Sequence, residues 1–94
     1  MENQEDFYSK LKKQLAETST WPNLYLYKFI IPVKPDQSAT LLKIFDNMGA
    51  VINSKESKTG KYTSFSIKVK LKNPDAVIKK YKEVAENVDG VISL

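Results

Sequence analysis

Residues 62–72 alternate apolar and polar side chains more strictly than any other part of the 94-residue chain. The apolar set, which includes one threonine, consists of Thr63, Phe65, Ile67, Val69 and Leu71. The polar set consists of Tyr62, Ser64, Ser66, Lys68, Lys70 and Lys72. Successive side chains of a β-strand point to opposite faces of its sheet. The period of two therefore predicts a strand with one buried face and one solvated face.

Residues 24–33 form a second predicted strand, and both of its faces are largely apolar. One face consists of Tyr25, Tyr27, Phe29, Ile31 and Val33, and the other of Leu24, Leu26, Lys28 and Ile30. This pattern is typical of a central strand that is covered on both sides, with Lys28 marking the wetter side. Shorter strands are expected at 50–57, where the outer half is polar, and at 91–94.

Three segments carry the one-sided apolar stripes of amphipathic helices. They are residues 5–17, 36–48 and 74–88. Asp36 or Ser38 is expected to cap the middle helix, because short polar side chains at that position can accept hydrogen bonds from the first free N–H groups. The last helix has a strong start signal, since an asparagine and a proline stand together immediately before its apolar stripe.

The order of these elements predicts an α+β fold of the ferredoxin-like βαββαβ type, preceded by one extra N-terminal helix. Such a fold is a two-layer sandwich in which a four-stranded antiparallel sheet has the strand order 4-1-3-2. We expect the N-terminal helix and its connector at 1–20 and the ferredoxin-like domain at 21–94, with Trp21 packed between the two. The sequence leaves open whether the extra helix covers the second sheet face, where Leu26 and Ile30 would otherwise meet water.

The residue types that most enzymes use for catalysis are missing from this chain. It contains neither cysteine nor histidine, which removes thiolate nucleophiles, disulfides and the commonest general base and metal ligand. The carboxylates are dispersed, and the three glycines do not have the spacing of a phosphate-binding loop. We therefore expect no enzyme activity, no cofactor and no metal site. A nucleophilic Lys28 on a half-buried face is the catalytic alternative.

The chain also shows no feature of a membrane or secreted protein. No stretch approaches the ~20 consecutive apolar residues that span a bilayer. The N-terminus is acidic and lacks the apolar core of a signal peptide. Together with the absence of cysteine, this composition predicts a cytoplasmic protein without membrane contact.

Positive charge is concentrated in one segment. Residues 55–72 contain six lysines and one acid, Glu56, and so carry +5, whereas the whole chain carries +4. The predicted partner or ligand face consists of Lys28, Tyr62, Ser64, Ser66, Lys68 and Lys70. The leading hypothesis is a non-enzymatic regulatory or adaptor domain that uses this face to bind a protein partner or a small acidic metabolite.

The last predicted strand suggests a second interface. It consists of Val91, Ile92, Ser93 and Leu94, and it should lie at an edge of the sheet. An exposed edge strand can pair with a second copy of the chain or with another protein.

Weak nucleic-acid binding is the main alternative, because a four-stranded sheet of this topology is also an RNA-binding platform. The segment that begins at Gly60 superficially resembles an RNA-recognition motif. However, the two stacking positions of that motif fall on Lys61 and Thr63, which are not aromatic. All fifteen basic residues are lysine, and arginine, the usual reader of guanine edges, is absent. A solvated strand face is therefore the simpler interpretation of the lysines.

Several segments together resemble the YbeD-like family, a bacterial domain family of unknown function. They are Trp21-Pro22, Tyr27-Lys28, the run from Gly60 to Ile67, and residues 91–94. The resemblance implies a ferredoxin-like fold over residues 21–94, with kinship of shape to the ACT regulatory domains that bind amino acids beside metabolic enzymes. It implies no catalytic residue. The loop in which ACT domains commonly carry a glycine has none here.

Overall fold

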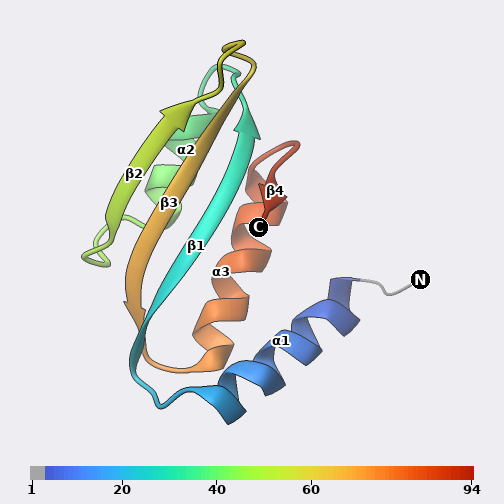
Figure 1. The fold of residues 1–94 in the computed structure, drawn as a ribbon, viewed down its shortest axis with the longest axis vertical. Coiled ribbons are helices and arrows are strands. Elements are labelled where there is room, and N and C mark those ends of the chain that lie inside the picture. Colours follow the sequence, from blue (N-terminus) through green and yellow to red (C-terminus); the bar gives the residue numbers. More distant parts are fainter. Residues whose placement is uncertain (1–3) are drawn as a thin grey trace.

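The structure, a computed structural model, describes residues 4–94 and confirms the predicted ferredoxin-like arrangement (Figure 1). Over these residues the chain forms three helices and one four-stranded antiparallel sheet with the order β2-β3-β1-β4, which is equivalent to 4-1-3-2. The elements are α1 (Gln4–Thr18), β1 (Asn23–Pro32), α2 (Gln37–Ile44), β2 (Val51–Glu56), β3 (Tyr62–Leu71), α3 (Pro74–Asn87) and β4 (Ile92–Ser93).

The two central strands, β1 and β3, pair along their whole lengths. Their register runs from Asn23 opposite Leu71 to Pro32 opposite Tyr62. Because directly opposed residues share a face of the sheet, this register places every apolar residue of β3 beside the aromatic side of β1. The buried strand residues are Tyr27, Phe29, Ile31, Phe65, Ile67, Val69 and Leu71.

The core between sheet and helices is rich in aromatic rings. Tyr27 is fully buried, and its ring centroid lies 4.9 Å from that of Tyr81 on α3 and 5.2 Å from that of Phe45 after α2. Phe29 contacts the same two rings. Edge-to-face and offset geometries of this kind add to the stabilisation that burial of the rings provides.

The helix ends match the sequence signals in α3 but not in α2. Asn73 caps α3 as predicted, and its side chain accepts a 2.8 Å hydrogen bond from the Ala76 N–H. At α2, Asp36 occupies the predicted N-cap position, but it has φ 67° and makes no capping side-chain bond, while Ser38 lies inside the helix. The helix also ends at Ile44 instead of residue 48, because the chain tightens into turns and Asn47 adopts a positive φ.

The N-terminal helix packs on α3 and leaves the second sheet face open (Figure 1). Tyr8 is buried and stacks on Tyr81 at a centroid distance of 6.4 Å. As predicted, Trp21 packs between α1 and the rest of the domain, and its indole N–H donates to the Leu15 carbonyl oxygen at 3.2 Å. The ammonium of Lys82 lies 5.5 Å from the centre of the Tyr8 ring, which adds a cation–π contact between α1 and α3.

One expectation about β1 is consequently wrong. This strand is covered on one side only, because all the helices lie on the same side of the sheet (Figure 1). Leu24 and Leu26 are 58% and 48% exposed, whereas Tyr27 and Phe29 are 0% exposed. Periodicity identified two apolar faces, but it cannot say whether a second layer exists to cover them.

Paired alanine substitutions on the two faces test this asymmetry. Ile67→Ala should lower the free energy of unfolding by about 3 kcal/mol, because it opens a cavity in the core. Leu26→Ala should lower it by less than about 1 kcal/mol, since the leucine is half exposed. Urea unfolding measures both values. Equal losses would mean that the open face is covered in solution.

Candidate partner-binding face

The register of the strands defines the side chains of the uncovered face. Leu24, Leu26, Lys28 and Ile30 of β1 stand opposite Lys70, Lys68, Ser66 and Ser64 of β3. On the far side of β3, Lys68, Ser66 and Ser64 stand opposite Val51, Asn53 and Lys55 of β2. On the far side of β1, Ile30 stands opposite Ile92 of β4. We call these side chains, together with Tyr62 and Leu94 at its margins, the open face.

The side chains of β3 on the open face are mainly polar, but the other strands add exposed aliphatic side chains to it. Its large exposed apolar side chains are Leu24, Leu26, Val51, Tyr62, Ile92 and Leu94. Because they come from all four strands, they do not form one continuous stripe, and lysines stand between them. A partner that covers this face would therefore meet aliphatic side chains and lysine ammonium groups together.

Four lysines give the open face its charge. They are Lys28, Lys55, Lys68 and Lys70, and no carboxylate stands on the face at any position that the strand register defines. Within residues 5–94, none of the four takes part in a salt bridge. The salt bridges to Asp75 and Glu5 lie instead between α1 and α3. Among residues 5–94, the ammonium groups of the open face are therefore left without a direct ion pair.

The six residues predicted as a partner or ligand face lie together, because β1 and β3 pair in the register that places Lys28 opposite Ser66. What this prediction missed is the contribution of β2, namely Val51, Asn53 and Lys55. Their alternate spacing is visible in the sequence. Only the pairing of β2 with β3 shows that they extend the same face.

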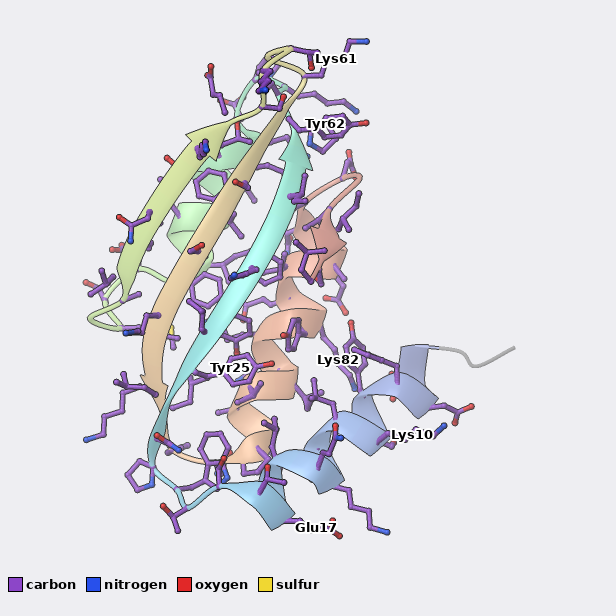
Figure 2. All side chains as sticks on the ribbon, viewed as in Figure 1. Lys10, Glu17, Tyr25, Lys61, Tyr62 and Lys82 are labelled. Carbon is purple, nitrogen blue, oxygen red and sulfur yellow. The ribbon has the colours of Figure 1, made fainter. Side chains whose placement is uncertain are left out.

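An open hollow of about 300 Å³ lies at the hairpin end of the open face. Its lining consists of Ile30, Lys55, Glu56, Ser57, Lys58, Tyr62 and Ser64. Two of its hydroxyls already have partners: the Ser57 hydroxyl oxygen accepts from the Tyr62 N–H at 3.2 Å, and the Ser64 hydroxyl donates to the Lys55 carbonyl oxygen at 3.3 Å. Figure 2 shows Tyr62 close to this end of the sheet, beside Lys61 of the turn.

The candidate edge strand is shorter than predicted, since β4 consists of Ile92 and Ser93. Val91 packs partly against the core, whereas the side chains from Ile92 to Leu94 are exposed. The Leu94 N–H donates to the Lys28 carbonyl oxygen at 2.9 Å and so extends the pairing with β1 by one hydrogen bond.

The groups that could support catalysis do not converge. Lys28 is exposed, so the half-buried environment assumed for a nucleophilic lysine is wrong. The Tyr25 and Tyr81 hydroxyls lie 2.7 Å apart, and the Tyr27 hydroxyl donates to the Val77 carbonyl oxygen at 3.0 Å. Burial raises the pKa of Tyr27 and of Tyr81 well above the usual value of about 10, so both hydroxyls stay neutral at physiological pH. The residues the structure describes contain no cluster of metal-ligating side chains.

No protein-family model, curated protein or solved structure matches the chain, so the open face is interpreted from its geometry and chemistry alone. The resemblance to the YbeD-like family stays a prediction. Among the described residues, no helix has the length and apolar character needed to cross a bilayer.

The buried tyrosines predict a loss of stability at alkaline pH. The folded chain holds their protons more tightly than the unfolded chain, whose tyrosines ionise near pH 10. Their contribution is therefore complete below pH 10 and decreases as the pH rises above it, by up to about 1.4 kcal/mol per pH unit for each tyrosine. Urea unfolding of the wild type and of Tyr27→Phe between pH 8 and 11 should show a shallower decrease in the variant. Identical slopes would contradict the assignment.

Proposed function

We propose that the chain is a non-enzymatic regulatory or adaptor domain that binds an acidic protein partner through the open face. The observation that carries this proposal is the presence of four lysines among exposed aliphatic side chains, with no carboxylate at the register-defined positions of the face and Glu56 only in the hollow at its hairpin end. The aliphatic groups favour a partner surface that displaces water from them. The lysines favour a partner that brings carboxylates to the same surface.

The charge of the open face also disfavours a second copy as the partner in a face-to-face arrangement. Stacking two such faces would bring eight lysine ammonium groups together, because each copy contributes four and carries no acid at the register-defined positions of the face. Juxtaposed like charges oppose association when they are desolvated. Self-association through β4 avoids this repulsion and is a separate proposal for that edge.

Nucleic-acid binding has less support from the composition of the face. Single-stranded nucleic acids are commonly held by aromatic rings that stack on the bases. On the open face Tyr62 is the only such ring among the described residues, and it lies at the margin, while Leu26 and Ile30 occupy the middle of β1. Lysines alone would give weak binding that depends steeply on salt.

The hairpin hollow favours a small acidic metabolite as a second candidate ligand. Lys55 and Lys58 both line this hollow of about 300 Å³, together with the aliphatic side chain of Ile30. A volume of this size fits the lower end of small-molecule sites. Glu56 lines the same hollow and would oppose an anion that approached its side.

Charge reversal on the open face tests the protein-partner proposal. In pulldowns with the full chain, Lys68→Glu/Lys70→Glu should lose the proteins that the wild type captures, because the variant repels acidic surfaces. Lys13→Glu/Lys79→Glu is the matched control, since it makes the same charge change at exposed positions on α1 and α3. That control should capture the same proteins as the wild type.

Equal losses in the two double variants would contradict the proposal, because net charge alone would then explain the binding. Titration of the chain with single-stranded RNA and DNA at low salt tests the alternative, nucleic-acid binding. Binding that is tighter to nucleic acid than to any captured protein, and that Lys68→Glu/Lys70→Glu abolishes, would replace the protein partner by a nucleic acid.

A thermal-shift screen with small dicarboxylates and inorganic phosphate tests the hairpin hollow. A ligand that binds the folded chain raises its melting temperature by mass action. Lys55→Ala/Lys58→Ala should remove the shift and leave the melting temperature without ligand nearly unchanged, because both side chains are exposed. A shift that persists in this variant would place the ligand elsewhere.

A further inference from the structure

The edge of β1 that faces β4 is open over most of its length. The strand has ten residues, but β4 pairs only with Phe29 and Ile30. The Leu94 N–H adds one hydrogen bond, to the Lys28 carbonyl oxygen. From Asn23 to Tyr27, β1 therefore has a strand partner on its β3 side only. A central strand of the sheet thus behaves as an edge strand along half of its length.

Backbone geometry identifies the free groups on this edge. The N–H and C=O of one strand residue point to the same edge, and the direction alternates along the strand. Because the Lys28 carbonyl points toward β4, the backbone groups of Leu26 and Leu24 point to the same side. The Leu24 N–H is satisfied by the Asn23 side chain at 2.8 Å. Within residues 4–94, the Leu24 carbonyl and both backbone groups of Leu26 have no partner strand on that side.

We infer that this edge is a strand-addition site for an extended segment of an acidic partner protein, which runs antiparallel to β1 in line with β4. The inference deepens the proposed function and rests on it. Donors and acceptors that repeat every second residue fit an extended backbone and do not fit a helix. About five residues, or about 17 Å of strand, would cover Asn23 to Tyr27.

The two faces of the sheet specify the alternation of the partner segment. A residue that hydrogen-bonds opposite Leu26 would place its side chain on the open face. It would lie two strand spacings, about 10 Å, from Lys68, a separation that the side chains of a lysine and a glutamate can span together. Acidic side chains are therefore favoured at these positions.

The alternate residues of the segment would point toward the helix layer. Tyr25 is half-buried there, and Figure 2 shows its side chain directed from β1 toward α3. Its hydroxyl is already engaged with that of Tyr81, so the part of Tyr25 left to contact the segment is the carbon surface of its ring. Apolar side chains are favoured at these positions. The predicted segment therefore alternates acidic and apolar residues.

A synthetic peptide provides the direct test. The probe is the acetylated and amidated hexapeptide of alternating glutamate and valine, added to the full chain and followed by amide NMR. Addition should shift the Leu26 and Lys28 amide signals and slow the hydrogen exchange of the Leu26 N–H, because that group becomes hydrogen-bonded. Binding without protection of Leu26 would overturn strand addition.

N-methylated versions of the peptide supply the matched control. In the antiparallel arrangement the glutamate amides point to β1 and the valine amides point away. Methylation of the glutamate amides should weaken binding by about tenfold or more, whereas methylation of the valine amides should leave it within about twofold. Equal affinities would overturn the inference while leaving binding to the open face intact. No binding of any peptide, even at low salt, would contradict the proposed function as well.

A substitution in the chain tests the same hydrogen bond from the other side. Leu26→Pro removes the free N–H, and this residue donates no ladder bond to β3, so the fold should tolerate it. Leu26→Val keeps the N–H and is the control. We expect Leu26→Pro to weaken the peptide by about tenfold and Leu26→Val to change it little. If Leu26→Pro does not fold, the comparison of the N-methylated peptides still tests whether the peptide binds by strand addition.

Light scattering without peptide tests whether a second copy occupies the edge. The inference predicts that the Leu26 amide exchanges quickly in the chain alone, so that no second copy pairs with this part of β1. A dimer at micromolar concentration, with Leu26 already protected, would overturn the peptide site and assign the edge to pairing between two copies.

Discussion

A single layer of helices covers the sheet, and the remaining features of the molecule depend on that asymmetry. β1 carries apolar side chains on both faces, but the helices bury only the side with Tyr27 and Phe29. The aromatic contacts of Tyr81 and Phe45 hold this side together. Because α1 docks on α3 instead of on the second face, the aliphatic side chains there stay exposed. The candidate partner-binding face is a consequence of this arrangement.

Much of the fold could be predicted from local sequence patterns, because a clear period or a clear start signal is compatible with only one kind of local structure. The alternation in β3 determined its buried and solvated sides, and the Asn73-Pro74 pair determined the start of α3. The failures include the second face of β1 and the end of α2. Whether the second face of β1 is buried depends on which helices pack on it, and periodicity does not show this. The α-helical hydrogen bonds of α2 give way after Ile44 to turns in which Phe45 and Asp46 bond to Leu42 and Lys43, and the apolar spacing through residue 48 does not show this change.

The candidate site could be predicted only in part for the same reason. Parity along β3 grouped Lys68 and Lys70 with Ser64 and Ser66, and the structure places them on one face. The register with β2 was needed to add Lys55. The open edge of β1 could not be predicted from the sequence, because it follows from the short length of β4. A segment predicted at 91–94 forms a strand of only two residues.

Lysine acylation measured by mass spectrometry tests most directly whether a partner covers the open face. The purified chain and the chain isolated with its partners from cells are treated with the same amine-reactive reagent. The account predicts that Lys28, Lys68 and Lys70 react more slowly in the isolated complex, while Lys13 and Lys79 on the helices react at unchanged rates. Protection of Lys13 and Lys79 with full reactivity at Lys28, Lys68 and Lys70 would contradict it.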